Sequence, residues 1–78
     1  MGELISSFEK NNREEVRVSI DEYMGKKLVN IRVFYKSEKG GEWLPGKQGV
    51  AISIDRYREL AEAILKVGEK LRADGLLR

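Results

Sequence analysis

The segment Lys27–Lys36 constrains the fold more than any other part of the sequence, because it carries apolar residues on both faces of a predicted strand. Successive side chains of an extended chain point to opposite sides. One side receives Val29, Ile31, Val33 and Tyr35, and the other receives Leu28, Asn30, Arg32 and Phe34. Each face must therefore meet a hydrophobic core, a partner subunit or a ligand.

Shorter runs around this segment predict the rest of an antiparallel sheet. Residues 16–20 alternate between apolar and polar side chains, and a turn centred on Gly25 follows. The remaining signals are a loop at residues 37–41, a third strand at 42–44 that Pro45 and Gly46 interrupt or turn, and a short fourth strand at 49–52. Residues 1–14 predict a flexible N-terminal tail or a short helix, and residues 15–78 are expected to form a single domain.

The C-terminal part of the chain predicts one amphipathic helix. Ser53 is a candidate N-cap, and Gly75 is a candidate C-terminal cap. Apolar residues recur every three or four positions at Tyr57, Leu60, Ala61, Ile64, Val67, Gly68 and Leu71, with Leu65 at the border of this stripe. We therefore predict an α+β fold, in which a curved four-stranded antiparallel sheet precedes one C-terminal helix. One helix covers only one face of such a sheet, so the remaining surface must face water or a second copy.

The chain has 78 residues and contains neither cysteine nor histidine. This composition excludes disulfides, thiolate metal sites and histidine-based catalysis. The acidic residues near the first predicted strand match no metal-binding loop and are interpreted as a solvated surface: Glu14, Glu15, Asp21 and Glu22. We expect a protein that binds rather than catalyses, and that holds no metal or other cofactor. A domain this small buries little surface, so we also expect a homodimer.

The net charge of +2 hides an uneven distribution of charged side chains. Residues 1–22 hold three basic and six acidic residues, residues 23–58 hold eight basic and three acidic residues, and residues 59–78 hold four of each. The local balances are therefore −3, +5 and 0. A concentrated basic segment is typical of a surface that binds a polyanion, although lysines and arginines also serve solubility alone.

No stretch approaches the ~18 apolar residues that a membrane-spanning helix needs. The first residues also lack the basic start and apolar run of a signal peptide. We expect a soluble, intracellular protein with no membrane partner. Its compartment would be the cytoplasm, in association with the nucleoid, in a prokaryote or phage, and the nucleus in a eukaryote.

Several of these runs together resemble the transcriptional coactivator family called positive cofactor four. The most specific elements are Ile31-Arg32-Val33-Phe34-Tyr35 and Pro45-Gly46-Lys47-Gln48-Gly49-Val50, and the resemblance covers residues 16 to about 72. It implies a four-stranded sheet with a C-terminal helix, dimerisation through the helices, and binding of single-stranded DNA with little sequence preference. The implied cellular roles are transcription, replication or repair, in the company of a second copy and of transcription or replication proteins.

The resemblance also assigns roles to individual residues. It implies base stacking on Tyr23 and Tyr35, and phosphate contacts from Lys26, Arg32 and Lys47. To these we add residues of this chain's own, so that the predicted DNA-binding set is Tyr23, Lys26, Lys27, Arg32, Tyr35, Lys36, Trp43 and Lys47. The predicted dimer interface is Tyr57, Leu60, Ile64, Leu65, Val67 and Leu71.

The sequence departs from the family pattern at three positions, and each departure predicts a weaker surface. Met24 and Gln48 stand where basic residues are common, and Asp21 replaces a frequent arginine. Periodicity alone places Tyr35 in a core, and it leaves Trp43 equally suited to covering the sheet edge. Two alternatives to single-stranded DNA binding stay open: a module that recruits transcription or replication proteins, and a binder that prefers RNA.

Overall fold

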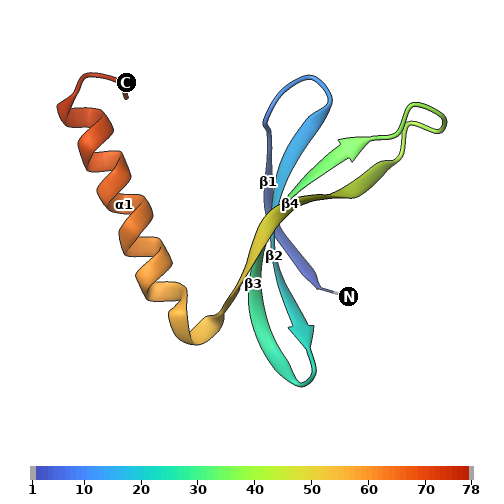
Figure 1. Cartoon of the computed structure of the whole chain (residues 1–78), viewed down its shortest axis with the longest axis horizontal. Coiled ribbons are helices and arrows are strands. Elements are labelled where there is room, and N and C mark those ends of the chain that lie inside the picture. The colour runs from blue at the N-terminus through green and yellow to red at the C-terminus, as the bar shows by residue number, and fades with distance from the viewer. Residues whose placement is uncertain (1, 78) are drawn as a thin grey trace.

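The computed structural model describes residues 2–77 as one antiparallel sheet and one long helix (Figure 1). The elements are β1 (Glu3–Glu9), β2 (Glu14–Tyr23), β3 (Lys26–Lys36), β4 (Trp43–Ser53), the 3₁₀ turn η1 (Ile54–Arg56) and α1 (Tyr57–Ala73). The strands lie in the order β1-β2-β3-β4, and each strand pairs with the next in antiparallel register. The predicted α+β class, with four strands followed by one C-terminal helix, is confirmed.

Strand β1 corrects the prediction for the N-terminus. Residues 3–9 were expected to be a tail or a short helix, but they pair with β2 along their whole length. The register shifts between Leu4 and Ser6, which is the mark of a β-bulge. A bulge inserts one residue out of step, so the apolar residues Leu4, Ile5 and Phe8 do not alternate, and the period of two that reveals a strand is lost.

Strand β4 corrects a second prediction, because the expected third and fourth strands are one continuous strand. Pro45 and Gly46 do not end it; they fall in an irregularity of the β3–β4 ladder, where Arg32 pairs with Gly49 and Phe34 pairs with Pro45. β4 lies at the edge of the sheet, where a proline removes no ladder hydrogen bond to a further strand. The chain therefore has four strands, as predicted. The predicted third and fourth strands are both parts of β4, and β1 was not predicted as a strand.

The turns and helix ends follow the sequence signals. The predicted turn at Gly25 is a two-residue hairpin connection, in which both Met24 (φ 52°) and Gly25 (φ 80°) adopt positive φ, as a type I′ turn requires. Ser53 is an N-cap as predicted, since its Oγ accepts from the Asp55 N–H at 3.3 Å, although it caps η1 rather than α1. Gly75, with φ 73°, terminates the helix as predicted.

The sheet has two chemically different faces and no hydrophobic core of its own. The face toward η1 and the start of α1, which we call the apolar face, carries Val18, Ile20, Val29, Ile31 and Val33. The opposite face, which we call the polar face, carries Arg17, Ser19, Asn30, Arg32 and Phe34. Figure 1 shows α1 standing beside the sheet rather than lying across it. As a result, no side chain among residues 2–77 is fully buried.

The length and composition of α1 bear on one further prediction. Within residues 2–77, no helix combines the length and the apolar character that crossing a membrane requires.

Candidate nucleic-acid interface

The β2–β3 hairpin holds three of the predicted DNA-binding residues. Tyr23 and Lys26 face each other directly across its two-residue turn, and both are exposed, Tyr23 by 67%. Lys27 points to the other side of the strand, where its cross-strand neighbour is Glu22. An exposed ring beside an exposed ammonium group can hold a base and its phosphate at once.

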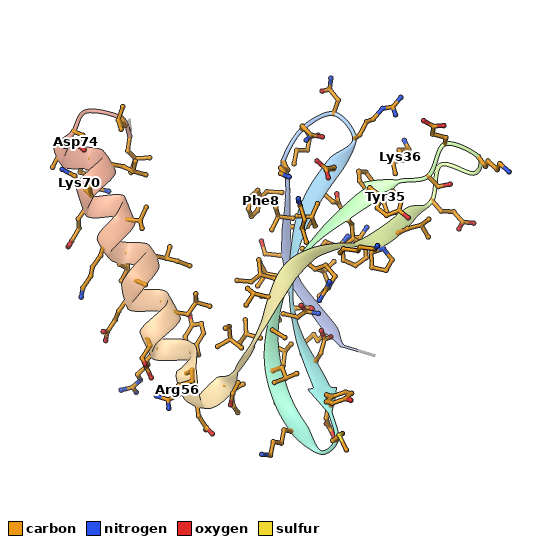
Figure 2. The ribbon with its side chains drawn as sticks, in the orientation of Figure 1. Phe8, Tyr35, Lys36, Arg56, Lys70 and Asp74 are labelled. Carbon is orange, nitrogen blue, oxygen red and sulfur yellow. The ribbon has the colours of Figure 1, made fainter. Side chains whose placement is uncertain are left out.

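The other end of β3 holds a second aromatic and basic group. Lys36 pairs with Trp43, and Tyr35 pairs with Leu44. Figure 2 shows Tyr35 and Lys36 at the end of the strand next to the 37–41 loop. Tyr35 is 43% exposed in the single chain. Trp43 is half-buried, which leaves both its predicted DNA contact and its alternative role at the sheet edge open.

Arg32 lies in the middle of β3, between these two groups, and the β4 irregularity holds its side chain. Its Nη1 donates to the carbonyl oxygen of Gly46 at 3.1 Å. Its guanidinium lies against Gly49, where a Cβ atom would stand 3.2 Å from the Arg32 Cζ and 2.7 Å from the backbone oxygen of Ile31. Gly49 therefore leaves room for the arginine over the β4 backbone, whereas a Cβ at Gly46 would stand 2.8 Å from the backbone oxygen of Val33.

Lys47 lies within the same irregularity but serves the opposite face. It lines an open hollow of about 210 Å³ together with Tyr35, Glu14 and Gln48. The predicted DNA-binding set is thus divided between the two faces. Tyr23, Lys26, Arg32, Lys36 and Trp43 share the polar face, whereas Lys27, Tyr35 and Lys47 lie on the other.

A small polar cluster joins the β1–β2 turn to this hollow. Lys10 Nζ donates to Gln48 Oε1 at 3.3 Å and to Glu14 Oε1 at 3.4 Å, and Asn11 Nδ2 donates to the same Glu14 oxygen at 2.8 Å. The Asn11 hydrogen bond, together with Lys10, lowers the pKa of Glu14 below its ordinary value of 4.5. Gln48 therefore ties β4 to the first hairpin.

Arg17 and Phe34 belong to the polar face and were missed by sequence reasoning. Arg17 pairs with Arg32 across β2 and β3, and its Cζ lies 4.2 Å from the centre of the Phe34 ring. Arg17 escaped notice because it lies outside the basic segment, in a stretch whose net charge is negative. The available signal was its place on the polar side of the predicted 16–20 strand, opposite the strand that carries Arg32.

The predicted dimer residues lie along one side of α1. Ile64, Leu65, Val67 and Tyr57 are each at least half exposed, and Leu60 and Leu71 are partly covered. At the base of the helix, Tyr57 and Ile54 border an apolar hollow of about 410 Å³ against Val18, Ile20 and Val29. The stripe is thus present as predicted and lies open to solvent in the single chain.

Comparison with known proteins identifies the family of the chain. The family model described as Transcriptional Coactivator p15 (PC4) matches residues 10–63. A curated relative from Neurospora crassa, named a putative RNA polymerase II transcriptional coactivator, is 38% identical over 65 residues. The match covers 83% of this chain and 35% of that protein, so the chain spans about a third of the relative's length.

Solved structures agree with this match. The crystal structure of BPSL1147, a PC4 homologue from Burkholderia pseudomallei, superposes with a TM-score of 0.78 at 22% identity, over 87% of this chain and 98% of that one, which supports the fold alone. A crystal structure of a MoSub1 complex with single-stranded DNA matches at 32% identity and a TM-score of 0.65, over 88% of this chain and 78% of that one. With its fold, its motifs and these matches in agreement, the chain belongs to the Transcriptional Coactivator p15 (PC4) family.

Proposed function

We propose that the chain is a homodimeric, sequence-tolerant single-stranded DNA-binding protein that serves transcription, replication or repair. The observation that carries the proposal is the row of exposed aromatic and basic side chains along β3 and its two hairpins. Tyr23 and Tyr35 would stack on bases, which contributes ~1–3 kcal/mol per base for any sequence. Lys26, Arg32 and Lys47 would contact phosphates.

The family relatives support this proposal. The solved MoSub1 complexes contain DNA, and one of them contains single-stranded DNA. The MoSub1 chains are 30–32% identical to this chain, over 88–90% of this chain's length. An open, twisted sheet can follow one flexible strand along its surface. Rigid duplex DNA presents its bases only at the edges, so it offers no ring faces for Tyr23 and Tyr35 to stack upon.

The exposed surface of the single chain supports the homodimer. Its accessible surface is 6834 Å², whereas a compact monomer of 8.9 kDa exposes about 4,800 Å². The excess is therefore about 2,000 Å² per chain, and stable interfaces bury about 800 Å² or more per partner. A second copy that covered the helix stripe and the apolar hollow at Tyr57 would bring the exposed surface toward the ordinary range.

The shape of the apolar surface favours a second copy as the occupant. The helix stripe and the hollow at Tyr57 are continuous in the chain, and both are apolar. A two-fold dimer uses the same patch on both copies, so one stripe can cover its counterpart. The two sheets would then lie at the outside of the dimer, with their polar faces, and the end of the other face that holds Tyr35 and Lys47, free for DNA.

The proposal is tested by competition against a fluorescently labelled single-stranded oligonucleotide. Unlabelled single-stranded DNA, duplex DNA and RNA of the same length are compared at two salt concentrations. The proposal expects single-stranded DNA to compete best and duplex DNA to compete much more weakly. Arg32→Gln should weaken binding of all sequences alike, whereas the matched control Arg58→Gln, on α1, should not. Duplex DNA that competes as well as single-stranded DNA would contradict the proposal. RNA that competes better than single-stranded DNA would identify RNA as the preferred ligand.

A second function, recruitment of transcription proteins, is favoured by the names of the curated relatives. The Neurospora crassa and Drosophila melanogaster proteins are both named as RNA polymerase II transcriptional coactivators. Purified protein applied to a single-stranded DNA column separates the two possibilities. A stable dimer that passes through the column, yet binds a purified transcription or replication protein, would favour recruitment over DNA binding.

A further inference from the structure

The centre of the polar face contains a pair of arginines that the fold does not explain. Arg17 on β2 and Arg32 on β3 are direct cross-strand neighbours. Like charges in this position destabilise a sheet, and neither side chain is needed to fill a core. Each guanidinium is instead fixed by other groups, which shows that their placement is specific.

Arg17 is held in a defined geometry. Its Cζ lies 4.2 Å from the centre of the Phe34 ring, and its Nε donates to Glu15 Oε1 at 2.5 Å. Both partners share its face, because Glu15 is two residues away on the same strand and Phe34 is the cross-strand neighbour of Glu15. The side chain remains 27% exposed. A guanidinium that rests on a ring on one side can accept a second flat group on its open side.

The surroundings of this pair form an open hollow of about 280 Å³ on the polar face. Leu4, Ser19 and Asn30 contribute to its lining. Asn30 Nδ2 donates to Asp21 Oδ2 at 2.8 Å, but Asn30 Oδ1 is buried and has no hydrogen-bond donor within the described part of the chain. The Asn30 oxygen is shielded from solvent, so the arginines are the groups of the hollow that a ligand would meet.

The charges of the hollow indicate what kind of group would bind at Arg17. Arg17 is paired with Glu15, and Asp21 accepts from Ser19 and Asn30. A phosphate at Arg17 would gain little, because Glu15 already pairs with that guanidinium. A nucleobase is flat and uncharged, so it suits the open face of the Arg17 guanidinium.

We infer that Arg17, supported by Phe34, is a third base-stacking position for the proposed single-stranded ligand. This inference rests on the proposed function and adds to it a position on the polar face, which also carries Tyr23. All four bases have a ring face, so the position remains tolerant of sequence.

The test compares Arg17→Lys with wild type on two oligonucleotides of equal length, one of thymidines and one composed of abasic sites. Arg17→Lys keeps the charge and removes the flat guanidinium. Stacking predicts that this substitution weakens binding to the thymidine strand about fivefold or more. It also predicts less than a twofold effect on the abasic strand and an unchanged salt dependence. Arg58→Lys, on α1, is the matched control and should have no effect on either strand.

The other outcomes separate failure of this inference from failure of the proposed function. Equal loss on both oligonucleotides would show that Arg17 contacts the backbone and would overturn the stacking position. If Arg17→Lys binds both oligonucleotides as tightly as wild type does, the stacking position is overturned. The proposed function would still stand, because wild type would still bind single-stranded DNA. Absence of single-stranded DNA binding by wild type would overturn both. Phe34→Leu removes the ring that supports Arg17 and should weaken binding to the thymidine strand in the same way. Thermal unfolding of each variant separates an effect on binding from an effect on folding.

Discussion

Replacing Ile64 with alanine should weaken the proposed dimer by an amount that follows from the exposure of this side chain. Ile64 is 56% exposed in the single chain, at the middle of the α1 stripe. Burying a whole isoleucine side chain contributes ~1.5–3 kcal/mol, so covering the exposed half contributes about 1 kcal/mol. A two-fold dimer contains the contact twice, which gives about 2 kcal/mol and about a 30-fold rise in the dissociation constant.

Sedimentation equilibrium of wild type and Ile64→Ala over a range of concentrations measures this change. Glu62→Ala, on the charged side of the same helix, is the matched control. Alanine favours helix formation, so neither substitution should reduce the helix content. The wild-type unfolding temperature should also rise with concentration, because residues 2–77 of the single chain contain no buried side chain. A wild-type protein that is monomeric at every concentration, or equal dissociation constants for both variants, would refute the reasoning.

Three further predictions follow from local geometry. Gly49→Ala should lower the stability by ~1–3 kcal/mol in thermal unfolding and should also weaken DNA binding. The added Cβ would stand 2.7 Å from a β3 carbonyl oxygen and would press on the Arg32 guanidinium. An unchanged DNA affinity would contradict the position proposed for the Arg32 side chain. Met24→Asn should stabilise the hairpin by ~0.5–1 kcal/mol in denaturant unfolding, since asparagine tolerates positive φ better than methionine; a destabilised hairpin would count against the turn type. The lowered pKa of Glu14 stabilises the folded state above pH 4.5, and this contribution disappears as pH falls through the folded-state pKa. Glu14→Gln should therefore be less stable than wild type at pH 7, and the difference in stability should shrink as pH falls below 4.5; a difference that does not change with pH would contradict the assignment.

Elements with an undisturbed period of two were predictable, and elements with bulges were not. β3 has no bulge against β2, and its alternation correctly placed the residues of each face. β1 contains a register shift near Leu4, so its apolar residues fall out of step. The Pro45–Gly46 pair was interpreted as a break because proline lacks an amide donor. At a sheet edge that donor is not needed, and the strand continues.

The candidate site was predictable as a set of residues but not as an arrangement. The family resemblance pointed to Tyr23 and Lys26, whose proximity depends only on a two-residue turn. The position of the Arg32 side chain against Gly46 and Gly49 depends on a register shift between β3 and β4, and no local sequence pattern encodes that shift. The Arg17 position depends in the same way on pairing between β2 and β3, which brings it over a ring 17 residues away in the chain.

The structure shows where the unevenly distributed charges of the sequence lie on the sheet. The basic segment at residues 23–58 extends over β3, β4 and the start of α1, and its cations occupy both faces of the sheet. The acidic segment before it supplies Glu14 and Glu15, which form ion pairs with Lys10 and Arg17. These carboxylates therefore help to orient basic side chains.

The salt dependence of single-stranded DNA affinity tests the central proposal most directly. Each phosphate contact on a single strand lowers log K by ~0.7 per unit of log salt, so Lys26, Arg32 and Lys47 together predict a slope of about −2 for each engaged chain. Replacing all three with glutamine should remove most of that slope, and the stacking residues should retain weak, nearly salt-independent binding. An affinity of wild type that does not change with salt, or a slope that survives the triple replacement, would contradict capture of the DNA backbone by these residues.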